Sequence, residues 1–210
     1  MNIDTLPVVT EIESLCARIP ITIDLTTATI ELAELTLKLR INRYIQEALD
    51  GPTGVYSINL THLPGLQGHH RFSKFTGQHS LLLADKVNES MFIYQLAEIK
   101  NTYIAEVMNK VIAYHKATYG TEFTGRTQIV WSLAGLCDYP LHTDPHTPHR
   151  YHIPLQTDPN FNWVFGVDDK LCKLHMPADG GIWYLNPVKL THTVRHTGTV
   201  PRIHLLMTTV

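Results

Sequence analysis

Residues 127–135 read TQIVWSLAG and residues 149–156 read HRYHIPLQ, and these two stretches begin the series of short β-rich runs that decides the fold. The series continues with NWVFGV (162–167), KLCKLHM (170–176), GGIWYL (180–185), THTVRH (191–196) and PRIHLLM (201–207). Pro, Gly, Asp and Asn separate the runs, a pattern that indicates a β-sandwich or barrel. Jelly rolls, which include the cupins, hold small-molecule sites between two sheets. We therefore predict a double-stranded β-helix over residues 127–210.

The chain before residue 127 has a mixed pattern of helical and extended stretches. Residues 6–25 indicate a short helix or strand followed by the extended ARIPITIDL. The pattern then predicts a helix over 28–49 that Asp50-Gly51-Pro52 ends, a strand over 55–60, and a helix from about Ser90 to Tyr119 that ends at Gly120. We expect an α+β protein with a mainly β core and one domain over 1–210, in which residues 1–126 supply supporting helices and substrate loops.

Composition excludes several classes of protein. The 44% hydrophobic content is that of a globular protein, and 17 basic against 19 acidic residues give no overall field for nucleic acid or an anionic membrane. Cys16, Cys137 and Cys172 are scattered, which argues against a disulfide framework or a structural zinc site. The N-terminal residues show no secretory pattern and no apolar run reaches membrane-spanning length. We expect a cytoplasmic protein, and the sequence is silent on its oligomeric state.

Histidine is concentrated toward the C-terminal end of the chain. Of the 13 histidines, the following lie between residues 142 and 204: His142, His146, His149, His152, His175, His192, His196 and His204. In an extended segment His142 and Asp144 point to the same side, so both can bind one ion. With His192 they make two imidazoles and one carboxylate, the ligand set of non-haem Fe(II) oxygenases. The alternative is that Asp144-Pro145 forms a simple turn and His192 is a hydrogen-bonded core residue.

Three further polar side chains accompany this set. Arg202 follows His192 by ten residues, and we predict a hairpin in which the two lie roughly opposite each other on neighbouring strands. Such an arginine supplies a fixed cation for a dicarboxylate co-substrate. Arg150 and His152 share one face of the run RYHIPL, and burying them inside a small barrel would be costly unless they bound something ionic.

Five motifs in this order carry a family resemblance: H-x-D, R-Y-H-I-P-L, G-G-I-W-Y-L-N-P, H-T-V-x-x-x-G and P-R-I-H-L-L. Together they resemble the aspartyl/asparaginyl β-hydroxylase-like family over about residues 127–207. Members of that family are Fe(II)- and 2-oxoglutarate-dependent oxygenases, and they include bacterial proline-type hydroxylases. The resemblance implies a dioxygenase that uses Fe(II), 2-oxoglutarate and O2 to hydroxylate an unactivated C–H bond of an amino acid or peptidyl residue, with release of succinate and CO2.

The resemblance also assigns roles to individual residues. It implies that His142, Asp144 and His192 are the metal ligands and the catalytic centre. It places Arg202 on the distal carboxylate of 2-oxoglutarate, and it places Arg150, His152 and Ser132 in the same co-substrate pocket. Some members have only two histidine ligands, whereas Asp144 here completes a triad.

Contacts with the substrate are less defined. Trp163, His146 and His196 are candidates, and His196 stands where the family usually has Asn. The alternatives are a core aromatic for Trp163, a solvent-exposed loop residue for His146 and a structural residue for His196. The histidine-rich loop over 62–79 is either a solvated loop or a lid that recognises substrate. We expect a small molecule or a peptide as the partner.

Two other functions compete with a 2-oxoglutarate oxygenase. One is a cupin-like metalloenzyme, an isomerase or a hydrolase, which does not use 2-oxoglutarate. Such an enzyme would not require Arg202. The other is a non-catalytic module that binds a metal through the same triad.

Overall fold

The computed structural model describes residues 3–38, 55–62, 72–74, 92, 94–133, 135 and 140–209. The strands are β1 (Cys16–Thr22), β2 (Val55–Asn59), β3 (Thr61–His62), β4 (Phe72–Lys74), β5 (Tyr94–Gln95), β6 (Gly125–Ser132), β7 (His149–Gln156), β8 (Phe161–Val167), β9 (Lys170–Leu174), β10 (Gly181–Leu185), β11 (Thr191–His196) and β12 (Arg202–Thr209). The helices are α1 (Leu25–Lys38) and α3 (Tyr103–Tyr119), and Ile3–Thr5 and Ala97–Ile99 form 3-10 turns. No helix in these ranges is long and apolar enough to span a membrane.

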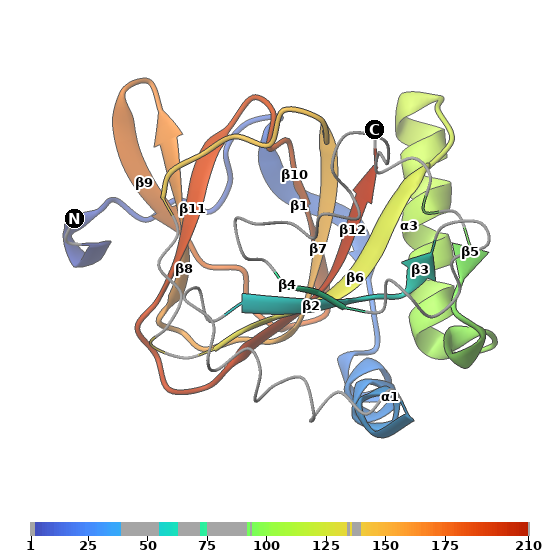
Figure 1. Ribbon diagram of the computed structural model, residues 1–210. Coiled ribbons are helices and arrows are strands. Elements are labelled where there is room, and N and C mark those ends of the chain that lie inside the picture. Colours follow the sequence, from blue (N-terminus) through green and yellow to red (C-terminus); the bar gives the residue numbers. More distant parts are fainter. Residues whose placement is uncertain are drawn as a thin grey trace.

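Two antiparallel sheets face each other, as Figure 1 shows. In the described residues the larger, here called the major sheet, has the order β1-β10-β7-β12-β6-β2-β4. The smaller, the minor sheet, has the order β11-β8-β9, and β3 pairs with β5 separately. Consecutive strands β10, β11 and β12 alternate between the two sheets, which is the crossing pattern of a double-stranded β-helix. The predicted fold is confirmed.

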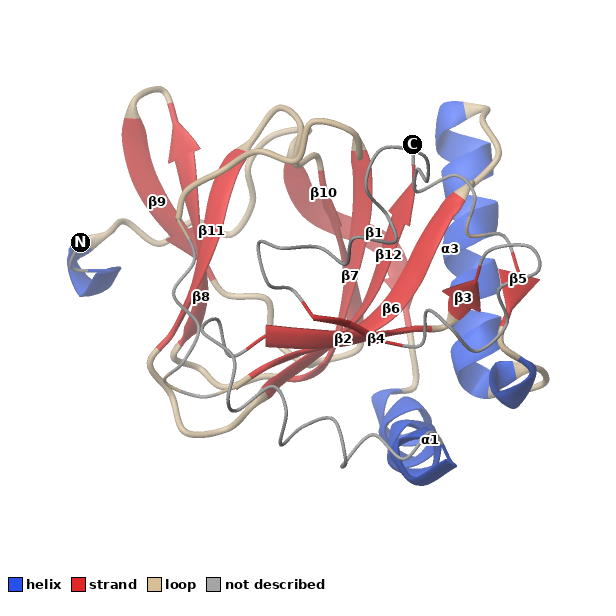
Figure 2. Cartoon of the chain, viewed as in Figure 1, coloured by secondary structure: helices blue, strands red, loops and turns tan. Residues whose placement is uncertain are grey.

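The outer face of the major sheet packs against both helices, which lie on one side of the strands (Figure 2). Alternate residues of the strands, such as Tyr151, Ile153 and Leu205, contribute to one buried cluster with Leu35 of α1 and Val111 of α3. Each of these side chains is at most 1% exposed. Because side chains alternate across a strand, their neighbours in sequence point to the opposite face, toward the minor sheet.

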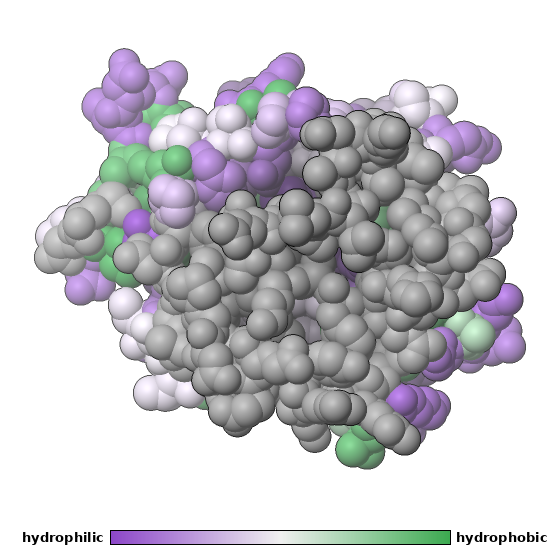
Figure 3. All heavy atoms as spheres, viewed as in Figure 1, coloured by the Kyte–Doolittle hydropathy of each residue, from purple (hydrophilic) through white to green (hydrophobic). Residues whose placement is uncertain are grey.

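A second buried cluster fills the space between the two sheets. It includes Trp163 and Phe165 of β8, Leu174 of β9, and Trp183 and Leu185 of β10. The tip of the β8–β9 hairpin, where Asp168 and Asp169 are exposed, is hydrophilic at the upper left of Figure 3. The strands predicted after residue 127 therefore occur where expected, and β1, β2 and β4 show that the earlier part of the chain adds strands as well as helices to the major sheet.

The predicted helix over 90–119 is wrong at its start and correct at its end. Helix α3 begins at Tyr103, where the Thr102 side chain accepts a hydrogen bond from the Ala105 N–H at 3.2 Å. Asn101 has a φ of 64°, and this left-handed backbone interrupts any helix that would run through it. The helix ends at Gly120, whose φ of 69° is the left-handed conformation typical of a helix end. The stop predicted at residues 50–52 for the first helix lies outside the described residues.

The hairpin predicted between His192 and Arg202 is also wrong. His192 pairs with Phe165 in the minor sheet, whereas Arg202 pairs with Ser132 in the major sheet. The link over 197–201 carries the chain from one sheet to the other, so the two residues lie on opposite sheets. The reason is that each strand pairs with a strand that is distant in the sequence, and the turn residues between β11 and β12 do not indicate which strand that is.

The Asp158 carboxylate holds this link in place. It accepts hydrogen bonds from the N–H groups of Asn160 at 2.8 Å, Thr199 at 2.9 Å and Val200 at 3.0 Å. These backbone N–H groups, that of Asn160 first, lower the pKa of Asp158 to about 2. A Cβ at Gly198 would lie 2.1 Å from the Asp158 Cγ, so this position has room only for glycine.

We predict that Asp158→Asn lowers the unfolding temperature at pH 7, because an amide cannot replace an acceptor-only carboxylate beside three N–H donors. The folded pKa of about 2 lies below the value of about 3.9 in an unfolded chain, so the contribution of Asp158 is present above pH 4 and is lost as the pH falls from 4 toward 2. Thermal unfolding of both proteins at several pH values checks this. A difference between them that stays constant down to pH 2 would contradict the prediction.

Candidate active site

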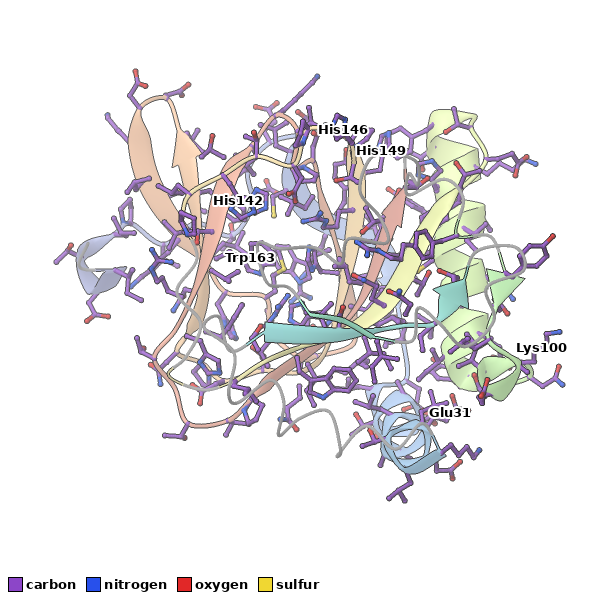
Figure 4. All side chains as sticks on the ribbon, in the orientation of Figure 1. Glu31, Lys100, His142, His146, His149 and Trp163 are labelled. Carbon is purple, nitrogen blue, oxygen red and sulfur yellow. The ribbon has the colours of Figure 1, made fainter. Side chains whose placement is uncertain are left out.

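Three predicted ligands meet beside the end of β11. One ligand atom each from His142, Asp144 and His192 lies within 4.8 Å of the others. The Asp144 Oδ1 is 3.8 Å from the His142 Nε2, and its Oδ2 is 3.6 Å from the His192 Nε2. Backbone hydrogen bonds in both directions between His142 and His192, at 3.0 and 2.8 Å, hold the two histidines side by side. In Figure 4 the labelled His142 lies by β11, above Trp163.

The hydrogen bonds of the two imidazoles fix their tautomers. The His142 Nδ1 lies 2.9 Å from the Pro140 carbonyl oxygen, and the His192 Nδ1 lies 2.9 Å from that of Leu190. A carbonyl oxygen only accepts, so each Nδ1 carries a proton and each Nε2 is the ring nitrogen left to face Asp144 and a metal. Two Nε2 atoms and one carboxylate therefore converge, and this is the donor set that binds a divalent cation.

Arg150 holds the carboxylate of this group. Its Nη1 is 2.6 Å from the Asp144 Oδ2, and its Nη2 reaches the Thr147 hydroxyl at 3.5 Å. Burial by itself would raise the pKa of Asp144, but the His192 imidazole and the Arg150 guanidinium lower it below its usual value. Asp144 is therefore ionised, and Arg150 lies beside the triad itself.

Arg202 lies on the inner face of the major sheet and is 4% exposed. Its Nη1 donates to the Ser132 hydroxyl at 3.1 Å, and its Nη2 donates to the His204 Nδ1 at 2.8 Å. The guanidinium carbon lies 4.6 Å from the Phe161 ring centre and 5.4 Å from that of Trp163. The predicted co-substrate residues Arg202 and Ser132 are therefore in direct contact, and aromatic rings of the minor sheet cover them.

Trp163 and His152 occupy the space between Arg202 and the triad. The Trp163 ring centre lies 4.8 Å from that of His152 and 5.8 Å from that of His192. Trp163 is 4% exposed, so it is buried in the sandwich instead of lying at the mouth of a pocket. Within the described residues, the Trp163 Nε1 and the His152 Nε2 are buried and have no hydrogen-bond partner. Buried polar atoms of this kind are expected where a ligand binds.

The other two candidates for substrate contact lie apart. The His196 Nε2 lies 2.8 Å from the Val200 carbonyl oxygen, and its Nδ1 accepts from the Gly198 N–H at 3.2 Å, so both ring nitrogens are engaged within the link over 197–201. His146 is exposed in a turn between Asp144 and β7. Contact of either residue with a substrate stays a prediction. Most of the loop over 62–79 lies outside the described residues.

His204 is a site residue that the sequence left open between a cavity-facing role and a core role. It is fully buried, two residues from Arg202 and therefore on the same face of β12. Burial and then the Arg202 charge lower the pKa of His204 well below its usual value, so the ring is neutral and can accept from Arg202. The shared parity with Arg202 was visible in the sequence, but a core role explained it equally well.

Comparison with models of known families finds no match to this sequence, and comparison with curated proteins finds none either. Solved structures do resemble it. A prolyl-4-hydroxylase from Pseudomonas putida has a TM-score of 0.52 and 11% identity over 92% of this chain and 91% of that chain. An oxidoreductase of the 2OG-Fe(II) oxygenase family from Burkholderia pseudomallei has a TM-score of 0.41 and 19% identity over 54% of this chain, and the match spans only 59% of that chain. The first likeness shows that the chain shares the fold of that prolyl-4-hydroxylase.

We predict that His204→Leu lowers the free energy of unfolding by about 1–3 kcal/mol, because the Arg202 Nη2 loses a buried acceptor. Urea unfolding measures the loss. His146→Leu is the matched control, since that histidine is exposed and its substitution should change stability by less than about 0.5 kcal/mol. Equal stabilities of the two variants would show that His204 is not needed to hold Arg202.

Proposed function

We propose that this protein is an Fe(II)- and 2-oxoglutarate-dependent oxygenase that hydroxylates a C–H bond of an amino acid or a peptidyl residue. Its fold is the double-stranded β-helix of such oxygenases. The resemblance of its motifs to the aspartyl/asparaginyl β-hydroxylase-like family favours that group within the fold. The observation that carries the proposal is the convergence of the Nε2 atoms of His142 and His192 on the ionised Asp144.

The donor set fits Fe(II). Two neutral imidazoles and one carboxylate suit a divalent first-row metal, and three protein ligands leave positions for other molecules. His142 Nε2, His192 Nε2 and the Asp144 carboxylate would hold the ion. Hydrogen bonds from each Nδ1 to a carbonyl oxygen, and from Arg150 to Asp144, are the outer contacts that orient metal ligands.

The residues around Arg202 fit the co-substrate. A guanidinium that is fixed by Ser132 and His204 and covered by Phe161 and Trp163 is suited to a carboxylate group. 2-Oxoglutarate has a second carboxylate and a keto group that can reach a metal. The unpartnered Nε2 of His152 and Nε1 of Trp163 lie between the two ends and can contact the bound acid.

When bound, iron and 2-oxoglutarate supply the oxidising chemistry, with succinate and CO2 as products. The chain supplies geometry and exclusion of water. Burial and then the charge of Arg202 keep the pKa of His152 well below its usual value, so His152 is neutral and does not compete with Arg202 for the anion. The stacked rings of Trp163 and Phe165, 5.9 Å apart, close the site on the side of the minor sheet. Arg150 keeps Asp144 oriented throughout.

A cupin-like isomerase or hydrolase, and an inert metal-binding module, remain the competing functions. Both would use the triad, and neither accounts for a buried arginine that is held by two hydrogen bonds near it. The two experiments below separate these possibilities because they test the metal and the co-substrate independently.

Adding Fe(II) and 2-oxoglutarate without oxygen should give the wild-type protein a visible metal-to-ligand charge-transfer band, and admission of air should then produce succinate. His142→Ala and His192→Ala should abolish both signals, because each removes one of three ligands. Absorbance and succinate assays measure the outcome, and His146→Ala is the matched control. A wild-type protein that binds Fe(II) but shows neither band nor succinate would exclude the proposed function.

Arg202→Gln should weaken binding of 2-oxoglutarate by roughly 10- to 100-fold, the effect of losing a charged hydrogen bond worth about 1.5–3 kcal/mol. Affinity for Fe(II) alone should not change, since Arg202 donates to Ser132 and His204, which are not among the three ligands. Titration of the charge-transfer band checks this. If the variant binds 2-oxoglutarate as the wild type does, Arg202 is not its anchor, and the cupin-like alternative gains support.

A further inference from the structure

The turn that joins β10 to β11, here called the β10–β11 turn (186–190), lies against the candidate metal centre. The Pro187 carbonyl oxygen accepts a hydrogen bond from the Asp144 N–H at 2.9 Å. The Leu190 carbonyl oxygen accepts one from the His192 Nδ1–H, also at 2.9 Å. One turn therefore holds two of the three proposed ligands, Asp144 through its backbone and His192 through its ring.

Asn186 closes the β10–β11 turn with both its backbone and its side chain. Its carbonyl oxygen accepts from the Leu190 N–H at 3.1 Å, and its Oδ1 accepts from the Lys189 N–H at 3.1 Å. A side-chain oxygen that binds the N–H three residues later is the arrangement of a helix N-cap. Pro187 then stands at the first helical position, where its missing N–H is not needed. The Asn-Pro pair that ends the motif G-G-I-W-Y-L-N-P therefore builds a single capped turn.

The two ends of the turn are anchored in the protein, and its middle is exposed. The Asn186 N–H donates to the Leu15 carbonyl oxygen at 2.7 Å. The Leu190 side chain is 1% exposed and belongs to the buried cluster between the sheets. Val188 and Lys189 are exposed between these anchors. The shape of the exposed part therefore depends on the bond from the Lys189 N–H to the Asn186 side chain.

We infer that Asn186 is a positioning residue for the metal centre, because it closes the turn whose two carbonyl oxygens orient the ligands. The inference rests on the proposed function for the identity of the ion. If the turn opened, the Leu190 carbonyl oxygen would move away from the His192 Nδ1. The ring could then turn its Nε2 away from Asp144, whose Oδ2 lies 3.6 Å from it. Outer contacts that orient metal ligands in this way commonly change metal affinity 10- to 100-fold when they are lost.

Four variants separate the cap from the other contact of the Asn186 side chain. Asn186→Ala removes the acceptor, and Asn186→Gln keeps the amide but places it one carbon too far along to bind the Lys189 N–H. Asn186→Ser restores a residue that caps as well as asparagine. The Asn186 side chain also interacts with the Tyr184 hydroxyl, so Tyr184→Phe is the matched control that removes this contact and leaves the turn closed.

Hydrogen exchange measured by NMR on the full chain without metal is the first test. The Asp144 amide proton and the His192 Nδ1 proton should exchange roughly 5-fold faster in Asn186→Ala and Asn186→Gln, the effect of losing a helix cap on local opening. Both protons should exchange as in the wild type in Asn186→Ser and Tyr184→Phe. The Asn160 amide, which donates to a carboxylate in another loop, is the internal reference and should not change in any variant.

Affinity for Fe(II) alone, measured by anaerobic calorimetric titration, is the second test. It should fall roughly 10-fold in Asn186→Ala and Asn186→Gln, because the ligands are less well oriented before the ion binds. Asn186→Ser and Tyr184→Phe should bind Fe(II) as the wild type does. A contact that only stabilises the fold would change neither the affinity nor the local exchange in this pattern.

The two tests also separate this inference from the proposed function. A wild type that does not bind Fe(II) rejects the proposed function, and the exchange rates, which need no metal, then decide the inference alone. Wild-type exchange in both loss variants, or fast exchange that Asn186→Ser does not restore, rejects the inference. Faster exchange at Asn160 as well would show general destabilisation and would reject it too. So would unchanged Fe(II) affinity in loss variants whose local exchange has risen.

Discussion

The alternation of side chains along β7, β12 and β6 is the constraint on which the rest of this molecule depends. Tyr151 and Ile153 point outward to the helices, while Arg150 and His152 point inward to the minor sheet. A slip of one residue in the register would bury the charged face against α1 and α3 and expose the apolar face to the site. The same strand pairing therefore stabilises the hydrophobic core and brings the polar site residues together. A change of register would disrupt both.

The strands after residue 127 were predictable because alternation and turn residues are local signals. Each predicted run there corresponds to an observed strand. The partner of each strand was not predictable, and the link from His192 to Arg202 shows why. A short turn between two strands usually makes a hairpin, but here β8 and β6 provide better partners on opposite sheets. The start of α3 was predicted wrongly for a different reason. Asn101 has a left-handed backbone, which the spacing of apolar residues along the chain does not indicate.

In the candidate site, too, the sequence predicted some features and not others. The sequence alone brought His142, Asp144 and His192 into one hypothesis, because two histidines and an aspartate are an informative set of metal ligands. The protonation of each imidazole at Nδ1 required the carbonyl groups of Pro140 and Leu190, which no motif names. The sequence assigned no role to residues that act through other residues, for the same reason. Asp158 acts through the backbone of another loop, and His204 acts through Arg202.

The contact between Asp158 and Gly198 has a consequence for how such a protein can vary. Because the carboxylate fits against a glycine and binds the following two N–H groups, the link between β11 and β12 has a fixed length. That link carries the chain from His192 on the minor sheet to Arg202 on the major sheet, so under the proposed function it would help to set the spacing between the two ends of the bound acid. If the proposed function holds, an insertion there would change the spacing of the two groups that hold the co-substrate, whereas an insertion at the exposed Asp168–Asp169 turn would not. Under the proposed function, engineering toward a longer keto acid would therefore begin by redesigning the link over 197–201 together with Asp158.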